Sequence, residues 1–305
     1  MAADGLIEEG DIMTNPIVHP QMPHVAVASA CLLGEGPVWD DRSNTLFWVD
    51  IKSQAVWRYH PETNEHSRVE APERIGFIAL TPDADVVVAG FKSGLKRFNL
   101  KTGEAEPIVS PEKDKPGNRI NDGHVGPDGA IYFGTMHDDE TEESGSFWRW
   151  DGKELTEFHS GFIVTNGPAF SHDGQTLYGT DTVNGMIYAF DANRGEIGEP
   201  RKFARFEEGW GHPDGMAVDA EGYVWVCHWG GSRITRFAPD GSVERTVPVP
   251  TAQVTKCAFG GPDLTTLYIT TASIGHDPHV DPMAGHLFKV ETGGIRGLKT
   301  SIFEG

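Results

Sequence analysis

Four side chains that carry oxygen donors stand at one equivalent position in a series of short apolar strands. These strands align on their last apolar residues, which are Trp39, Leu80, Val125, Phe170, Val218 and Phe259. The position four residues earlier then holds, in the same order, Glu35, Gly76, Asn121, Asn166, Asp214 and Thr255. Two of the six residues are carboxylates and two are carboxamides, so one structural position repeatedly offers oxygen ligands.

Carboxylate and amide oxygens are the donors that hard divalent cations prefer in proteins. Acids that converge without a cation repel one another, and at least one of their pKa values rises. A divalent ion would relieve that repulsion. Taken singly, Asp214 in front of Gly215 is also ordinary turn chemistry. The metal hypothesis therefore rests on the shared position rather than on any single motif.

The strands that must position these side chains belong to a repeat of the chain. Each repeat contains an apolar strand, a turn, a second strand that ends in small or polar residues, and a third strand. The second strands start at residues 46, 86, 131, 177, 224 and 267, at steps of 40, 45, 46, 47 and 43 residues. Short strands that recur at this spacing without a helical period are typical of propeller blades.

Six such repeats predict an all-β fold, a six-bladed β-propeller with a central metal-binding channel. Equivalent positions in a closed ring lie around one axis, so the six aligned residues should surround one mouth of this channel. We expect residues 23–305 to form this single domain, residues 24–29 to close the last blade as its outer strand, and residues 1–22 to be a flexible tail. A β-sandwich with coincidental spacing is the alternative.

Composition excludes several other classes of protein. The 305 residues carry a formal net charge of −20, which argues against nucleic acid or an anionic membrane as a partner. The three cysteines show no C-x-x-C spacing, and the apolar stretch 25–33 is too short to span a bilayer. No lysine or arginine precedes Arg42, so a basic signal-peptide region is missing. These features predict a soluble, cytoplasmic protein.

Several motifs resemble, in order, those of the gluconolactonase and senescence-marker-protein (regucalcin) family of six-bladed propellers. They are LGEGPVW (33–39), RINDG (119–123), FGTM (133–136), TNGPAF (165–170), TDT (180–182), PDGMAVD (213–219) and HWGG (228–231). Within that family the sequence is most similar to bacterial sugar lactonases that act on xylono- or arabinonolactone. The resemblance runs from about Leu33 to near the C-terminus.

The resemblance implies roles for individual residues. Glu35, Asn166 and Asp214 match the family's metal ligands, and Asp214 also matches the residue that transfers protons. Arg119 and Asn121 match its substrate-binding pair. An acidic residue shortly after GTM contacts the sugar in some members; Asp138 and Asp139 both fit this description, and Asp139 is taken as the candidate.

The resemblance implies metal-dependent hydrolysis of a sugar lactone, such as xylono-, arabinono- or gluconolactone, to the sugar acid. The cofactor would be one divalent ion, with calcium, manganese, magnesium, iron(II) and zinc all compatible with oxygen ligands. In this scheme Asp214 orients or deprotonates the attacking water. The sequence has no G-x-S-x-G elbow and no H-E-x-x-H motif, so it supports neither a serine triad nor that zinc site.

Other classes of function stay open at this point. One is a calcium-binding regulatory propeller without turnover, and another is a propeller esterase or phosphotriesterase with similar oxygen ligands. An interaction propeller would need no convergent acids.

Further side chains have two interpretations. His137 and His212 could contact substrate or simply pack near it. The histidine-rich stretch 275–286 is expected to be a solvated loop rather than a second metal site. Trp57, Trp148, Trp150, Trp225 and Trp229 occupy strand positions and are expected in the core.

Overall fold

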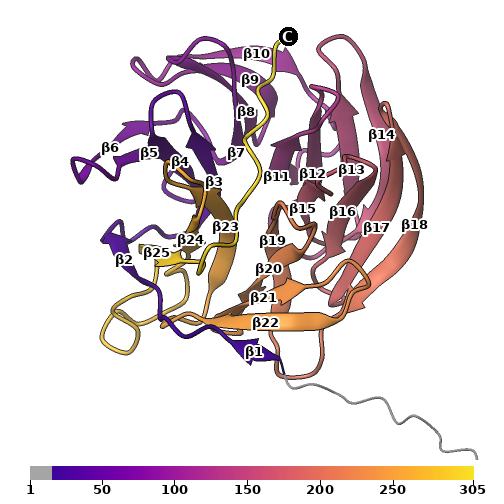
Figure 1. Cartoon of the computed structure of the whole chain (residues 1–305). Coiled ribbons are helices and arrows are strands. Elements are labelled where there is room, and N and C mark those ends of the chain that lie inside the picture. Colours follow the sequence, from indigo (N-terminus) through magenta and orange to yellow (C-terminus); the bar gives the residue numbers. More distant parts are fainter. Residues whose placement is uncertain (1–15) are drawn as a thin grey trace, which may run out of the picture.

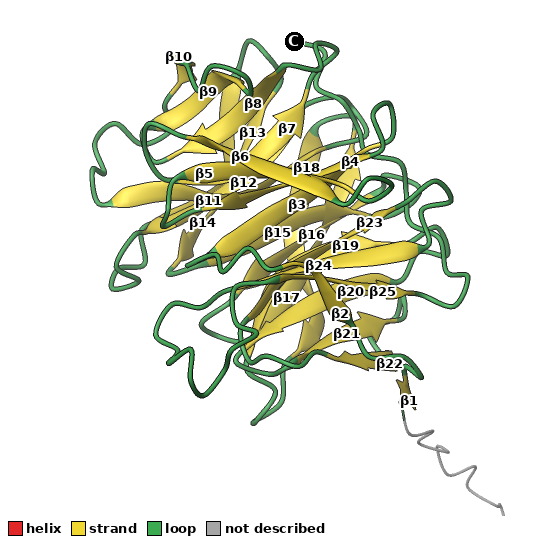
Figure 2. Cartoon of the chain, turned by 90° about the vertical axis from the view of Figure 1, so that its left-hand side faces the viewer, coloured by secondary structure: helices red, strands yellow, loops and turns green. Residues whose placement is uncertain are grey.

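The fold is a six-bladed β-propeller, as the repeats predict, in a computed structural model that describes residues 16–305. Its blades surround a central axis, with the first strand of each blade nearest to that axis (Figure 1). Seen from the side, strands and connecting loops make up the described part of the molecule (Figure 2). Within residues 16–305 there is no helix that is long and apolar enough to cross a membrane.

The strands follow one another outward from the axis in chain order. The first and second blades contain β3 (Gly34–Asp40), β4 (Thr45–Asp50), β5 (Ala55–His60) and β6 (Glu65–Glu70), then β7 (Ile75–Leu80), β8 (Val86–Phe91), β9 (Gly94–Asn99) and β10 (Ala105–Val109). The third and fourth contain β11 (Asn118–Val125), β12 (Ile131–His137), β13 (Gly145–Trp150) and β14 (Leu155–Phe162), then β15 (Thr165–Phe170), β16 (Thr176–Asp181), β17 (Met186–Asn193) and β18 (Glu196–Arg205). The fifth and sixth contain β19 (His212–Val218), β20 (Val224–Trp229), β21 (Arg233–Phe237) and β22 (Val243–Pro248), then β23 (Val254–Gly260), β24 (Thr266–Thr271) and β25 (Leu287–Glu291).

The sixth blade is completed by the N-terminal part of the chain. Strand β2 (His24–Val27) pairs antiparallel with β25, so the sheet order is β2-β25-β24-β23. Val27 and Cys31 also pack into the core between the sixth and first blades. The ring is thus closed by backbone hydrogen bonds and by apolar contacts, and the last blade has no open edge at β25.

The flexible tail expected over residues 1–22 differs from the structure at its end. Strand β1 (Ile17–Val18) pairs parallel with the outer strand β22, and the amide of His19 donates to the carbonyl of Thr246 at 2.8 Å. The reason is that β22 would otherwise expose unpaired backbone groups at a sheet edge, and an adjacent extended segment can satisfy them. Residues 1–15 of the expected tail lie outside the described residues.

The hydrophobic core is divided among the contacts between neighbouring blades. Six clusters of buried residues occur in the described part of the chain, and each draws its members from two adjacent blades. Trp225 of the fifth blade, for example, packs with Phe259 of the sixth, with ring centroids 5.6 Å apart. Because apolar side chains fill each wedge between sheets, the ring holds its inner strands in a fixed register around the axis.

Candidate functional site

Every inner strand contains a register irregularity at the level of the aligned polar position. The irregularities lie between Glu35 and Val38, Ile75 and Phe77, Ile120 and Gly123, Asn166 and Ala169, Pro213 and Met216, and Val254 and Lys256. In each case the inner strand has one residue more than the strand it pairs with. Such β-bulges bend a strand and redirect its side chains. One repeated backbone feature therefore places all six aligned residues at the same end of the channel.

Gly36, the residue after Glu35, shows why the LGEGPVW motif contains glycine at this position. Gly36 has a φ of 53°, and a Cβ at this position would lie 3.2 Å from the carbonyl oxygen of Gly76. A larger residue would be strained in this left-handed conformation and would press on the neighbouring blade. Glycine therefore permits the bulge that directs Glu35, whose own carboxylate accepts the Gly36 amide at 2.9 Å.

Four of the six aligned residues line one cavity of about 200 Å³. They are Glu35, Asn121, Asn166 and Asp214, and Arg119 joins them. The other two aligned residues do not line it. At Gly76 a Cβ would lie 2.1 Å from the backbone oxygen of Asn121, so there is no room for a side chain. Thr255 instead donates its hydroxyl to the carbonyl of Gly34 at 2.6 Å.

A chain of hydrogen bonds orients the polar side chains in this cavity. Arg119 Nη1 donates to Asn121 Oδ1 at 2.5 Å, and Asn121 Nδ2 donates to Asn166 Oδ1 at 3.0 Å. Asn166 Nδ2 donates to the Thr182 hydroxyl at 3.1 Å, and that hydroxyl donates to the Pro213 carbonyl at 2.9 Å. The network joins three blades and fixes which face of each amide is available to a ligand.

The carboxylates of Glu35 and Asp214 line the same cavity, and nearby positive charge only partly balances them. Glu35 and Asp214 are 6% and 5% exposed. Burial, followed by the charge of Asp122, raises the pKa of Glu35 to about 8, and Lys256 only partly opposes this effect. Burial, together with Glu35 and Asp122, raises the pKa of Asp214 well above its ordinary value. The negative charge is therefore under-compensated here, which suits a bound cation.

The residues present fit a divalent cation by their chemistry. Glu35 and Asp214 supply carboxylate oxygens, and Asn166 Oδ1 keeps a second lone pair beyond the one that accepts from Asn121. Within residues 16–305, no three His, Cys, Asp or Glu side chains gather as a metal-binding group. The set is consequently two carboxylates with an amide, and the assignment of these three residues as ligands stays a prediction.

A buried ion pair lies behind these carboxylates and was not singled out from the sequence. Lys256 Nζ contacts Asp122 Oδ1 at 2.5 Å, and both side chains are almost fully buried. Asp122 follows Asn121 in the RINDG motif, but its partner is 134 residues away. The position of Asp122 in that motif was the available signal, whereas nothing in the sequence indicated Lys256.

The structure separates the two acidic candidates that follow the GTM motif. Asp139, the expected substrate contact, is exposed, and neither it nor Asp138 lines the cavity. Asp138 is buried and accepts from Arg119 Nε at 3.0 Å. Strand β12 ends at His137, and in the turn that follows Asp138 bonds Arg119 while Glu140 lines the cavity beside it. The acidic residue that contacts the substrate-binding pair directly is therefore Asp138, and the role of Asp139 as a sugar contact stays a prediction.

Other side chains complete the wall of the cavity. His212 and Thr182 line it, and His212 Nδ1 lies 3.2 Å from the Thr182 carbonyl. Trp229, expected in the core, is only partly buried and lines it too. His137 does not line it and lies instead 3.0 Å from the Thr141 hydroxyl. Of the further lining residues, Thr182 belongs to the TDT motif, which was the signal that could have identified it.

The histidine-rich stretch 275–286 connects β24 to β25 in the sixth blade. Asp281 accepts from the Thr251 hydroxyl at 2.6 Å and lies 3.6 Å from His276, while Val280 is largely exposed. This segment contributes no residue to the lining of the candidate cavity.

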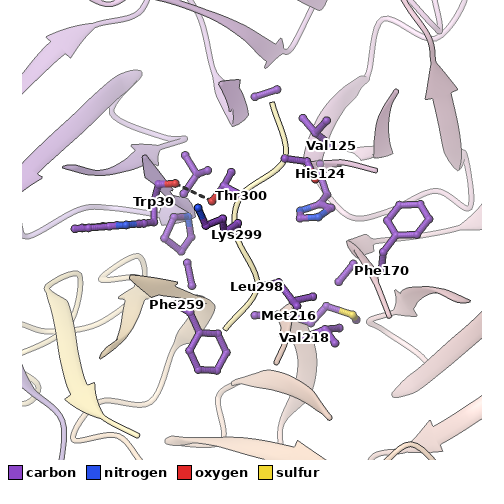
Figure 3. A pocket seen from close by; sticks show the side chains of 18 of the residues that line it. Trp39, His124, Val125, Phe170, Met216, Val218, Phe259, Leu298, Lys299 and Thr300 are labelled. Carbon is purple, nitrogen blue, oxygen red and sulfur yellow. Dashed lines mark hydrogen bonds between the residues drawn. The ribbon is translucent and has the colours of Figure 1, made fainter. Parts of the chain in front are cut away.

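A second cavity, of about 380 Å³, lies at the opposite end of the inner strands (Figure 3). All six aligned apolar residues line it, from Trp39 through Phe259. The segment Leu298–Ser301 crosses it, and the hydroxyl of Thr300 donates to the carbonyl of Trp39 at 2.7 Å. The inner strands thus present apolar residues at one mouth and the candidate ligands at the other, as their alignment requires.

The arrangement defines a class: a six-bladed propeller that gathers carboxylate, amide and guanidinium groups from different blades at one end of its channel. Residues 33–273 match the family described as SMP-30/Gluconolactonase/LRE-like region. The chain belongs to this family, as its motifs predict.

Three similar proteins illustrate the relationship. The chain is 36% identical to L-arabinolactonase of Azospirillum brasilense over 90% of this chain and 92% of that one. It is 35% identical to pentonolactonase XacC of Haloferax volcanii over 87% and 92% of the two chains. The crystal structure of a calcium-binding protein, regucalcin, from Agrobacterium tumefaciens is 27% identical, with a TM-score of 0.90, and is covered completely by 95% of this chain.

Proposed function

We propose that this protein is a metal-dependent hydrolase of sugar lactones, which converts an aldonolactone such as xylono-, arabinono- or gluconolactone to the sugar acid. One observation carries the proposal: Glu35, Asn166 and Asp214 line the same cavity as Arg119 and Asn121. The cavity of about 200 Å³ is below the roughly 300–1,000 Å³ of sites for drug-sized ligands. It therefore suits one sugar ring.

The relatives support the same reaction. Two of them are named as lactonases of pentose-derived sugars, and the similar solved structure is described as a calcium-binding protein. In this chain Glu35, Asn166 and Asp214 would hold one divalent ion. Calcium, manganese, magnesium, iron(II) and zinc are all compatible with two carboxylates and an amide. A bound ion of this kind supplies Lewis acidity for the carbonyl and lowers the pKa of a water molecule.

The chain's own residues would orient the sugar and move the proton. The Arg119 guanidinium donates in a fixed fork, and Asn121 both donates and accepts, so together they can grip ring and hydroxyl oxygens. Asp214 takes a proton from the attacking water, whose oxygen bonds to the lactone carbonyl carbon. The ester bond to the ring oxygen then breaks, and that oxygen takes up the proton held by Asp214 to become a hydroxyl of the open-chain acid.

The test is hydrolysis of a panel of pentono- and hexono-lactones, followed with a pH indicator and corrected for spontaneous opening. Metal-stripped protein should be inactive, and one or more divalent ions should restore activity. The double variant Glu35→Gln with Asp214→Asn should lose both bound metal and turnover. The matched control Glu199→Gln with Asp263→Asn, at exposed positions, should retain both.

Other outcomes would replace this proposal by a specific alternative. Metal binding without turnover of any lactone would favour a calcium-binding regulatory role. Metal-dependent cleavage of phosphotriesters or simple esters, but not of lactones, would favour a propeller esterase. Unchanged metal content in the Glu35/Asp214 double variant would remove these residues as ligands.

A further inference from the structure

Four cations gather around a single carboxylate beside the candidate cavity. Asp138 Oδ1 lies 3.0 Å from Arg119 Nε and 3.7 Å from Lys52 Nζ, and Asp138 Oδ2 lies 3.0 Å from Lys92 Nζ. Arg74 also pairs with Oδ2. We call Lys52, Arg74, Lys92 and Arg119 the basic cluster. Four positive charges thus surround Asp138, and the further carboxylate whose charge acts on Lys52 and Arg119 is Glu140, so cations are in excess in a protein whose formal net charge is −20.

Nearby lysines show that such an excess is not the rule in this part of the molecule. Lys96 pairs with Glu73, and Lys115 pairs with Glu112 at 3.1 Å, one cation to one carboxylate in each case. One cation balances the charge of a buried carboxylate such as Asp138, and uncharged donors can satisfy its remaining lone pairs. The additional cations at Asp138 therefore exceed what the fold requires of a simple ion pair.

The electrostatics of the cluster show the same excess. Burial would raise the pKa of Asp138, but the hydrogen bond from Lys92 and the charges of Arg119, Arg74 and Lys52 lower it to about 2. The pKa of Lys52 is lowered by burial and then by Arg119, although Asp138 opposes this change. A lysine destabilised by neighbouring positive charge gains from an added anion.

The topology brings these residues to the mouth that holds the candidate cavity. Lys52 and Lys92 follow the second strands β4 and β8, while Arg74 precedes the inner strand β7. In an antiparallel blade, the end of the second strand lies beside the start of the inner strand. Ile51, directly before Lys52, lines the candidate cavity, as does Glu140, whose charge acts on Lys52. The cluster is therefore continuous with the site.

Arg119 is the member of the basic cluster that lines the candidate cavity, and the other three members are partly exposed. The side chains of Lys52, Arg74 and Lys92 are 22%, 34% and 38% exposed, so none of them is sealed in the core. Arg119 lines both the candidate cavity and a neighbouring cavity of about 390 Å³, which Lys92 also lines. Arg119 thus stands between the sugar site and an open region with an excess of positive charge.

We propose that the basic cluster binds an anionic group, a carboxylate or a phosphate, at the end of the sugar remote from the lactone. The preferred substrates would then be lactones of sugar diacids or of sugar phosphates rather than neutral aldonolactones. This inference rests on the proposed function for the reaction, but the binding of the anionic group does not depend on turnover. Arg119 would contact both the sugar and the anion, because it faces both cavities.

The experiment compares matched lactones that differ in one charged group. Glucono-1,4-lactone is paired with glucaro-1,4-lactone, and glucono-1,5-lactone with its 6-phosphate. For wild-type protein the charged member of at least one pair should have a kcat/KM about 10- to 100-fold higher, as expected for charge-assisted hydrogen bonds. High salt should reduce that ratio. The pair that shows the preference identifies the anion as carboxylate or phosphate.

The variant Lys52→Gln with Lys92→Gln should lower the ratio about 10-fold or more. The matched control Lys101→Gln removes an exposed lysine that pairs with Asp85, and it should leave the ratio unchanged. A ratio near one in wild-type protein, with neutral lactones hydrolysed, would overturn the anion site and leave the lactonase proposal intact. An equal loss of kcat/KM for both lactones, together with a lowered melting temperature, would show that the cluster stabilises the fold. That result would also overturn the anion site.

A binding measurement separates this inference from the reaction. Calorimetry with gluconate, glucarate and 6-phosphogluconate uses the open-chain acids, so it needs no catalysis. Tighter binding of glucarate or 6-phosphogluconate than of gluconate, lost in the Lys52/Lys92 variant, would support the anion site even if no lactone is hydrolysed. Equal binding of all three acids would refute it.

Discussion

Replacing Glu35 by glutamine should stabilise the metal-free protein at alkaline pH while it removes metal binding. Burial and the charge of Asp122 raise the pKa of Glu35 from 4.5 to about 8. A carboxyl group with a raised pKa in the folded state binds its proton more tightly there than in the unfolded chain. Its contribution to stability is therefore complete below about pH 4.5 and is lost as the pH rises to about 8.

The size of this loss of stability follows from the rise in the pKa of Glu35. One pKa unit corresponds to about 1.4 kcal/mol, so a rise from 4.5 to about 8 corresponds to roughly 5 kcal/mol of unfolding free energy. Glutamine is close in shape to glutamate and carries no charge. The Glu35→Gln protein should escape most of this loss. At pH 8.5 it should exceed metal-stripped wild-type protein in stability by about 3–5 kcal/mol, and at pH 4.5 the two should be nearly equal.

Urea unfolding in the presence of a chelator, followed by the fluorescence of the eight tryptophans, measures this difference. The exposed control Glu199→Gln should follow wild-type protein at every pH. A divalent ion should then restore the alkaline stability of wild-type protein and leave Glu35→Gln unaffected, because only the former keeps the ligand. Parallel pH profiles for wild-type and Glu35→Gln protein would refute the reasoning, since they would show that Glu35 is not under electrostatic stress.

Three further predictions concern other parts of the site. Gly36→Ala should lower the free energy of unfolding in urea by about 1–2 kcal/mol, because the residue has a positive φ and its Cβ would press on the adjacent blade. The control Gly129→Ala, which has a positive φ but open space around it, measures the cost of the backbone conformation alone. Lys256→Met should destabilise by about 3–5 kcal/mol because Asp122 is left buried and unpaired, and adding Asp122→Asn should recover most of that loss. Arg119→Lys keeps the charge but loses the fork, so kcat/KM for lactones should fall about 10-fold or more in steady-state assays.

The fold and the shared position of the candidate ligands could be predicted because both depend on local periodicity. Each blade repeats the same strand pattern, so aligning Trp39 with Val125 or Phe259 also aligns the residues four places earlier. The structure shows the physical basis of that alignment: a bulge at the same level of every inner strand. Residues at the same register of the six inner strands come together when the blades close into a ring. Their proximity can therefore be predicted without information about long-range contacts.

The pairings between blades could not be predicted in this way. Lys256 and Asp122 come from the sixth and third blades, and no periodic pattern indicates that these two side chains meet. Which of Asp138 and Asp139 contacts Arg119 depends on the direction of the turn after β12, which adjacent acidic residues do not reveal. Likewise β1 joins β22 through backbone groups, which any short extended segment can supply.

The two ends of the inner strands meet different physical demands, and this difference decides where chemistry can occur. At one end Trp39, Phe170 and Phe259 surround the channel and Leu298–Ser301 crosses it, so burial of apolar surface dominates. At the other end the bulges direct polar side chains into the candidate cavity. Under-compensated carboxylates and an excess of cations at Asp138 lie within this same mouth. Both imbalances are costly in an empty site, and a cation bound beside the carboxylates with an anionic group bound at the cations would relieve them together.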